Sequence, residues 1–252
     1  MRTSAYGSHP QQVGDLHLPE GAGPHPVVVL WHGGSYSLEA DRTMLTAASG
    51  DLAARGWAAW NVSYRRLESG GGWPRTFDDA RAGLAQVAAL DAPLDLQDVT
   101  ALGFSAGLPL AHHATRRALA DTAAAVRPRR LVNLAGVARL EALARIADGA
   151  GIRRLVGHPD DVPEAYAEAD PARAPALGIP SLHLHGDADE LVPVGVSRRH
   201  VDRVRAGGDE AELEVVPGAG HFDLHRPDGP GWAHVVAWLE RTRGVPAGTP
   251  LN

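Results

Sequence analysis

The chain of 252 residues is 44% hydrophobic, so it has enough apolar sequence to bury a large core, and α/β folds of this length commonly form one domain. Its 24 Lys and Arg residues against 30 Asp and Glu residues give a net charge of -6, and no dense basic cluster is present to neutralise phosphates. Nucleic acid is therefore not an expected partner, and the lack of cysteine excludes disulfides, a thiol nucleophile and thiolate metal sites.

A membrane is not an expected partner either. The longest strongly apolar run, Val27–Trp31, is far shorter than the roughly 20 residues that span a bilayer. The first dozen residues are polar and lack the apolar centre of a signal peptide. We therefore expect a soluble, cytoplasmic protein, and these features leave its oligomeric state open.

Predicted strands and helices alternate along the chain. Short segments rich in β-branched and aromatic residues between Gly and Pro predict strands, and apolar residues at helical spacing predict helices. In chain order the expected elements are strand Val27–Trp31, helix Asp41–Arg55, strand Trp57–Tyr64, a helix that starts at Thr76, strand Val99–Gly103, a helix after Ser105, strand Leu131–Leu134, strand Ser181–His185, helix Val194–Arg205, strand Ala211–Val216 and helix Gly231–Arg243. This order predicts a single domain over residues 1–252 of the α/β class, with a mostly parallel central sheet and helices on both faces.

Three segments follow this pattern less clearly. Between residues 135 and 179, the helical stretches Leu140–Ile146 and Pro163–Ala169 are linked by loops with Gly and Pro, which predicts a small cap or lid insertion. Met1–Pro26 and Val245–Asn252 are expected to be peripheral strands or loose tails. Thr76, with an acidic residue three positions later at Asp79, resembles a capping box.

A candidate nucleophile lies where a predicted strand meets a predicted helix. The segment Gly103-Phe104-Ser105-Ala106-Gly107 has the pattern G-x-S-x-G. Glycines at its ends allow a tight turn that exposes the serine hydroxyl, and the helix that follows directs its first N–H groups toward a developing oxyanion. The pattern alone is as compatible with a glycine-rich turn that carries an incidental serine.

The segment His32-Gly33-Gly34-Ser35 follows the first strong strand. Its two glycines allow the backbone to approach a substrate closely and to present N–H groups. We expect the backbone N–H groups of Gly34, Ser35 and Ala106 to form an oxyanion hole. His32 is expected to brace this loop rather than to act as a base.

Candidates for the acid and the base follow later strands. A run from His185 to Pro193 contains Asp187 and Asp189, and His221 follows the last predicted strand. The chain order Ser, Asp, His is that of α/β-hydrolases. Serine needs a base within hydrogen-bond reach, and that base needs a carboxylate to fix its tautomer. The residues therefore predict Ser105 as nucleophile and His221 as base, and they leave Asp187 and Asp189 as alternatives for the carboxylate.

Several stretches carry a family resemblance. They are Trp31-His32-Gly33-Gly34, Asn61-Val62-Ser63-Tyr64-Arg65-Arg66, Gly70-Gly71-Gly72-Trp73-Pro74, His185-Gly186-Asp187-Ala188-Asp189 and Gly218-Ala219-Gly220-His221-Phe222-Asp223. Together they resemble the α/β-hydrolase group that includes kynurenine formamidase (arylformamidase) and related small esterases. The resemblance implies cofactor-free transfer of an acyl group to water from small esters or aryl formamides. It also implies that Asp189 is the acid, because Gly186, Val192 and Pro193 fit the pattern G-x-x-D-x-x-V-P.

The chain departs from that group beside the nucleophile. The group usually has a His before the G-x-S-x-G serine and a Gly-His pair after it, whereas this chain has Phe104, Leu108 and Pro109. Its H-G-G-x-W motif ends in Tyr36. These differences concern the substrate, and the expected substrate-binding residues are Tyr36, Trp73, Phe104 and Leu108. Trp73 has the equal alternative of anchoring the helix that follows it.

The expected function is therefore hydrolysis of a small carboxylic ester or aryl formamide through an acyl-enzyme intermediate, with no cofactor. No metal is expected, because His221 and His225 are four residues apart without an H-E-x-x-H motif. Two alternatives stay open. The same triad could serve an acyltransferase or a lactone-forming tailoring enzyme, and the fold could instead carry a catalytically silent ligand-binding protein.

Overall fold

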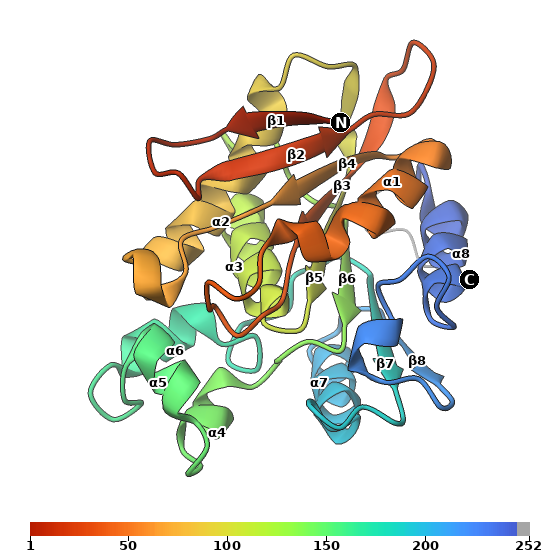
Figure 1. Cartoon of the computed structure of the whole chain (residues 1–252). Helices are drawn as coiled ribbons and strands as arrows, with labels where there is room; N and C mark the ends of the chain where they lie inside the picture. Colours follow the sequence, from red (N-terminus) through yellow and green to blue (C-terminus); the bar gives the residue numbers. More distant parts are fainter. Residues whose placement is uncertain (246–252) are drawn as a thin grey trace.

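A single eight-stranded sheet forms the centre of the protein. The computed structural model describes residues 1–245, and the strand order is β1-β2-β4-β3-β5-β6-β7-β8 (Figure 1). The strands are β1 (Arg2–Ala5), β2 (Val13–His17), β3 (His25–Trp31), β4 (Ala58–Val62), β5 (Leu94–Phe104), β6 (Arg130–Leu134), β7 (Ser181–Gly186) and β8 (Ala211–Val216). β1 and β2 pair antiparallel at one edge, and the neighbours from β4 to β8 pair parallel. The mostly parallel sheet predicted from the sequence is confirmed.

Helices connect the parallel strands, and a last helix follows β8. They are α1 (Thr46–Ala54), α2 (Arg75–Ala85), α3 (Gly107–Ala120), α4 (Leu140–Ala144), α5 (Ala150–Val156), α6 (Pro163–Ala169), α7 (Gly195–Ala206) and α8 (Trp232–Thr242), with the 3-10 turns η1 (Arg42–Leu45), η2 (Leu67–Ser69), η3 (Gln86–Ala89) and η4 (His221–Asp223). None of the helices in residues 1–245 is long and apolar enough to cross a membrane.

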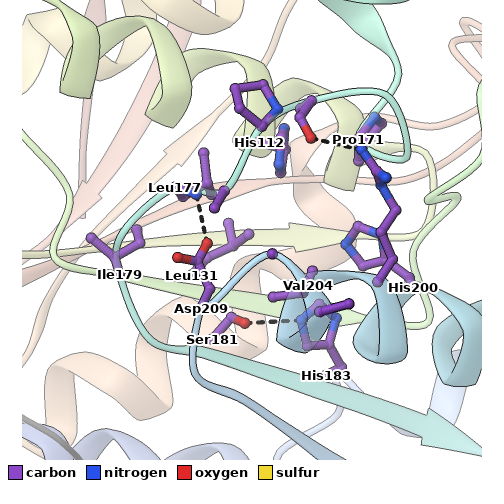
Figure 2. Close-up of a pocket in the computed structure, with 16 residues that line it drawn as sticks. His112, Leu131, Pro171, Leu177, Ile179, Ser181, His183, His200, Val204 and Asp209 are labelled. Atoms are coloured by element: carbon purple, nitrogen blue, oxygen red, sulfur yellow. Dashed lines mark hydrogen bonds between the residues drawn. The ribbon is translucent and has the colours of Figure 1, made fainter.

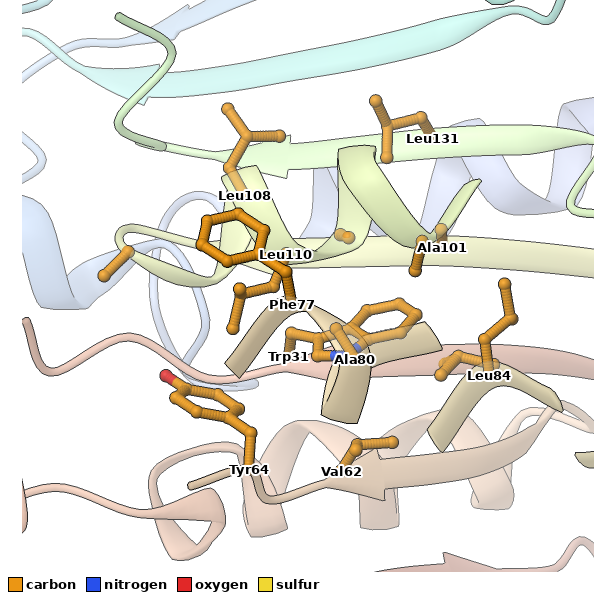
Figure 3. Close-up of a cluster of buried hydrophobic side chains, with 14 of the residues drawn as sticks. Trp31, Val62, Tyr64, Phe77, Ala80, Leu84, Ala101, Leu108, Leu110 and Leu131 are labelled. Atoms are coloured by element: carbon orange, nitrogen blue, oxygen red, sulfur yellow. The ribbon is translucent and has the colours of Figure 1, made fainter. Parts of the chain in front are cut away.

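The alternation of side chains along β3 divides the core into two layers. Val27, Val29 and Trp31 belong to a cluster that includes Phe77 and other residues of α2 and α3. The intervening residues of β3 belong to a second cluster with α1 and α8. Figure 3 shows the first cluster, with side chains of α2 packed over Trp31. Because successive side chains of a strand point to opposite faces, one fully buried strand supplies both layers.

Three short helices occupy the segment that was expected to form a cap. α4, α5 and α6 lie between β6 and β7, and they form a group next to α3 (Figure 1). The N-terminal segment forms the edge strand β1 and its neighbour β2. Of the expected C-terminal tail, residues 246–252 lie outside the described residues.

The predicted capping box at the start of α2 is wrong. The helix begins after Pro74, which provides no side-chain cap. Thr76 Oγ1 donates to the carbonyl of Arg65 at 2.7 Å and accepts from the N–H of Gly72 at 2.9 Å. Asp79 binds the guanidinium of Arg65. Both side chains therefore bind the segment that follows β4, and neither caps the first N–H groups of α2.

Candidate active site

Ser105 lies in the sharp turn between β5 and α3. Its backbone is left-handed, with φ 52°, a conformation that is uncommon outside glycine. Its N–H donates to the carbonyl of Leu134 at 2.9 Å, and its own carbonyl accepts from Leu108 and Val137 at 3.2 and 3.1 Å. Within the described part of the chain, the Ser105 hydroxyl makes no hydrogen bond, and the residue is partly exposed. The turn therefore fixes the backbone and leaves the hydroxyl accessible.

Both glycines of the G-x-S-x-G motif are required by close packing. A Cβ atom at Gly103 would lie 2.5 Å from Cα of Leu108, in the first turn of α3. A Cβ atom at Gly107 would lie 2.1 Å from the carbonyl oxygen of Trp31, at the end of β3. The motif thus brings the end of β3, the end of β5 and the start of α3 together.

Asp189 and His221 are joined by a buried hydrogen bond. His221 Nδ1 lies 2.7 Å from Asp189 Oδ2, and the two side chains are 5% and 0% exposed. Because a carboxylate only accepts, Nδ1 carries the hydrogen, and Nε2 keeps its lone pair for a proton from another group. Asp189 Oδ1 accepts from the N–H groups of Leu191 and Val192 at 2.9 and 2.8 Å. The carboxylate is therefore held at both oxygens.

The second candidate acid, Asp187, is turned away from this pair. It is exposed, and its Oδ1 accepts from the N–H of Gly218 at 2.6 Å. This bond ties the loop after β7 to the loop after β8. Of the two aspartates, Asp189 is the one that the structure brings to His221.

Because β5 and β8 run in the same direction, the serine and the histidine both lie beyond the carboxyl ends of the strands. Ser105 follows the end of β5, and His221 follows β8 after a short loop. The rings of Phe104 and His221 are 5.0 Å apart between centroids, so the residue before the serine packs against the candidate base.

The loop after β3 packs directly on the nucleophile. A Cβ atom at Gly33 would lie 2.9 Å from Cβ of Ser105. Gly34, Ser35 and Tyr36 have φ values of 100°, 52° and 61°, so three successive residues are left-handed. In residues 1–245, the backbone N–H groups of Gly34, Ser35 and Ala106 donate no hydrogen bond. The three N–H groups predicted to form an oxyanion hole are therefore not used within the described part of the fold.

His32 holds this loop from within. Its Nδ1 lies 2.7 Å from the carbonyl oxygen of Gly33, and its ring stacks on Tyr64 at 4.4 Å. The Tyr64 hydroxyl donates to the carbonyl of His32 at 2.8 Å. Complete burial lowers the pKa of His32 to about 3, so its ring is neutral. This is the bracing role that the sequence predicts.

The BD-FAE family model matches residues 15–203, which is most of the chain and includes both the Ser105 turn and Asp189. The chain belongs to the BD-FAE family.

Solved structures share the fold of this BD-FAE chain. A thermophilic esterase of Thermogutta terrifontis with propionate bound is 20% identical, with a TM-score of 0.73 over 95% of this chain and 90% of that one. A truncated carbohydrate esterase from gut microbiota is 18% identical, with a TM-score of 0.78 over 95% of both chains. A bifunctional GH43-CE protein of Bacteroides eggerthii is 20% identical, with a TM-score of 0.80 over 95% of this chain and 35% of that one. The predicted α/β-hydrolase fold is confirmed.

One curated relative of the BD-FAE chain matches over a short stretch. A monoacylglycerol lipase of Mycolicibacterium smegmatis (strain ATCC 700084 / mc(2)155) is 45% identical over 58 residues. The match covers 23% of this chain and 20% of the lipase.

Three of the four predicted substrate-binding residues have buried side chains in this BD-FAE chain. Tyr36 is 2% exposed, and Phe104 and Leu108 are 0% exposed. Phe104 lies beneath His221 and His225, and the other two belong to the core layer of α2 and α3. Their burial favours support of the site from the interior over direct contact with a substrate.

Trp73 fits its anchoring alternative. Its ring makes edge contacts with Phe77 at 5.1 Å and with His113 at 5.8 Å. The backbone N–H of Trp73 donates to the carbonyl of Leu155 in α5 at 2.6 Å. Trp73 therefore joins α2, α3 and the segment of short helices, and it stays partly exposed.

Sequence reasoning missed two features of the BD-FAE site. Leu38, Leu191 and Phe222 are 49%, 63% and 52% exposed, and each lies within four residues of a residue assigned to the site. The buried ring of His185 lies beside Asp189, with Nε2 3.3 Å from Oδ2. In the sequence, the one sign of these features was that the residues lie near the motifs. His185, for example, is the first residue of the run His185–Pro193.

A cavity of about 280 Å³ lies away from these residues, between α3, α7 and the first halves of β6 and β7. Figure 2 shows His112, His183, His200 and Ser181 in its wall, and no member of the proposed triad lines it. Among residues 1–245, no group of three or more His, Asp or Glu side chains is arranged to hold a metal ion.

Proposed function

We propose that this protein is a serine hydrolase that cleaves a small carboxylic ester through an acyl-enzyme intermediate. The observation that carries the proposal is the buried 2.7 Å hydrogen bond from His221 Nδ1 to Asp189. This bond lies at the carboxyl ends of the strands, where Ser105 also lies. This bond selects the tautomer that a general base needs, with Nε2 free to take a proton.

The reaction uses each group once in each half. Ser105 Oγ attacks the carbonyl carbon while His221 Nε2 takes the hydroxyl proton, and Asp189 stabilises the imidazolium. N–H groups of the loop after β3 and of Ala106 stabilise the oxyanion. The C–O bond to the alcohol then breaks, and His221 returns the proton to the departing oxygen. Water repeats the sequence on the acyl-enzyme and releases the carboxylic acid.

The names of the relatives support an ester as the bond that is cleaved. The structural relatives include esterases, one of them phosphoramylated by tabun, and the curated relative is a monoacylglycerol lipase. The exposed side chains of Leu38, Leu191 and Phe222 favour a substrate with an apolar part. An aryl formamide remains the finer alternative, on the resemblance to kynurenine formamidase.

The decisive experiment treats the wild-type protein and Ser105→Ala with a fluorophosphonate probe and measures hydrolysis of p-nitrophenyl acetate. We expect the wild type to be labelled at Ser105 and the variant to lose both labelling and at least about a thousandfold in kcat, because only binding and the oxyanion donors would remain. Circular dichroism checks that the variant is folded. Turnover by Ser105→Ala close to that of the wild type would contradict the mechanism.

The same assay separates the remaining alternatives. A catalytically silent binding protein would leave the probe unreacted. An acyltransferase would be labelled but would transfer the acyl group to an added alcohol or amine in preference to water. N-formylkynurenine in the substrate panel compares the aryl formamide with short esters.

A further inference from the structure

The ring of His185 makes three polar contacts in the interior. Its Nε2 lies 2.7 Å from the carbonyl oxygen of Val192 and 3.3 Å from Asp189 Oδ2. Its Nδ1 lies 2.7 Å from the hydroxyl oxygen of Ser197 in α7. His185, Ser197 and the Asp189 side chain are all 0% exposed. These groups therefore interact with one another and not with solvent.

The hydrogen positions follow from the partners. Carbonyl and carboxylate oxygens only accept, so the hydrogen of His185 is on Nε2, which is bonded to the Val192 carbonyl at 2.7 Å and lies 3.3 Å from Asp189 Oδ2. Nδ1 is then an acceptor, and the Ser197 hydroxyl donates to it. Burial lowers the pKa of His185, which agrees with a neutral ring.

We propose that His185 is a positioning residue of the active site, which donates Nε2–H to Asp189 Oδ2 and thereby holds the oxygen that His221 uses. The inference rests on the proposed function. Counting this contact, Asp189 receives two backbone N–H groups at Oδ1 and two histidine nitrogens at Oδ2, and within residues 1–245 His185 is the one side chain besides His221 that reaches it. Ser197 fixes the tautomer that makes the donation possible. A series of polar contacts thus leads from α7 to the base, through Ser197, His185, Asp189 and His221.

His183 provides a matched control on the same strand. It lies two residues before His185, so it faces the same side of β7, and it is also 0% exposed. Its Nδ1 accepts from Asn133 Nδ2 at 2.9 Å, and its Nε2 lies 3.0 Å from the Ser181 hydroxyl. The two histidines thus share burial, strand and a serine partner. They differ in that one contacts the candidate acid.

The test compares His185→Leu, His185→Gln and His183→Leu on p-nitrophenyl acetate across pH. We expect His185→Leu to lower kcat about tenfold to a hundredfold with little change in KM, which is less than the loss expected on removing the acid itself. The kinetic pKa should rise, because the charge of Asp189 then acts on His221 alone and favours the imidazolium. His185→Gln keeps an N–H donor and should recover most of kcat. The other titratable neighbour of His221, His225, is unchanged in every variant.

The two leucine variants decide the matter together. We expect similar losses of thermal stability for both, and a changed kcat and pH profile for His185→Leu alone. Equal kinetic effects, or superimposable pH profiles, would overturn the positioning role. If His185→Leu does not fold, Ser197→Ala removes the tautomer lock with a smaller change, and it should still lower kcat several-fold.

A measurement without substrate separates this inference from the proposed function. The His221 Nδ1 proton, bonded to Asp189, should give a low-field proton resonance. His185→Leu should move that resonance and His183→Leu should not. An inactive wild type that fluorophosphonate does not label would overturn the proposed function, whereas an unmoved resonance would overturn the role of His185.

Discussion

Ser105 holds its hydroxyl in place through the backbone. A non-glycine residue at φ 52° carries strain of order 1–3 kcal/mol, and such strain persists only where the surroundings fix the conformation. Here the hydrogen bonds to Leu134, Leu108 and Val137 supply that constraint. None of them uses the side chain. Replacement by alanine therefore removes the hydroxyl and leaves the turn intact.

The two aspartates after β7 differ in what their carboxylates do, and this difference predicts their variants. Asp189→Asn should lower kcat at least about a hundredfold, because an amide in place of Oδ2 no longer fixes the His221 tautomer. Asp187→Asn should lower kcat about tenfold or less, since an asparagine Oδ1 still accepts from Gly218. Both are measured on one activated short ester, with circular dichroism as the control for folding. A larger loss for Asp187→Asn would exchange the two assignments.

At the residue scale the sequence predicted which polar groups lie near one another better than which side chains are buried. Residue types and chain order were enough to select Ser105 and His221, and these are the residues that the structure brings to one sheet edge. The choice between Asp187 and Asp189 needed the family register, because the loop geometry that separates them has no local sequence signal. Phe104 and Leu108 adjoin the nucleophile in sequence, but their side chains enter the two core layers.

Elements with clear periodicity were predicted close to their observed bounds. β8 and α6 match the predicted ranges, because their apolar patterns and flanking residues mark both ends. β5 begins at Leu94, five residues before the prediction, because its first residues alternate between leucine and polar residues and most of them are only partly buried. The capping box predicted at Thr76 failed because residues distant from the helix end, Arg65 above all, bind the side chains of Thr76 and Asp79. Local patterns fix an element where no distant partner competes.

The loop after β3 should tolerate no side chain at Gly33. A Cβ atom there would meet Ser105 at 2.9 Å and the Phe104 ring at 3.1 Å, so Gly33→Ala should displace the loop and lower kcat at least about tenfold. Gly50 is the matched control. It lies within α1 with open space around its Cβ position, and Gly50→Ala should leave kcat unchanged and add about 0.5–1 kcal/mol of stability. Wild-type kcat in Gly33→Ala would show that the loop does not restrain the nucleophile.

Across the whole molecule, buried neutral histidines gather on the α7 side of the sheet. Along β7, Leu182 and Leu184 belong to the core layer of α8, and the alternate residues Ser181, His183 and His185 face α7. His112 and His200 face the same region from α3 and α7. The sequence shows this alternation, but it does not show that the polar face is buried. These serine and histidine side chains form a buried polar layer between the sheet and α7, which we call the polar seam. It extends from the cavity to Asp189.

This seam predicts a stability that falls in acid. Burial lowers the pKa of His112 to about 3 and that of His200 to about 4, with Arg203 as a further cause for His200, against an ordinary value of 6.5. Above pH 6.5 these rings are neutral in both states and do not oppose folding. As the pH falls from 6.5 toward 4 the unfolded chain binds protons that the folded protein excludes, so each ring lowers the unfolding free energy by about 1.4 kcal/mol per pH unit.

The measurement is urea unfolding between pH 7 and pH 4.5 for the wild type, His112→Leu, His200→Leu and the double variant. Each substitution should reduce the dependence of the unfolding free energy on pH, and the two reductions should be partly additive. Nδ1 of His200 is buried without a hydrogen-bond partner among the described residues, so His200→Leu should lose little stability at pH 7. A pH dependence that is the same in all four proteins would mean that these rings are protonated in the folded protein, and the acid sensitivity would then have to come from other groups.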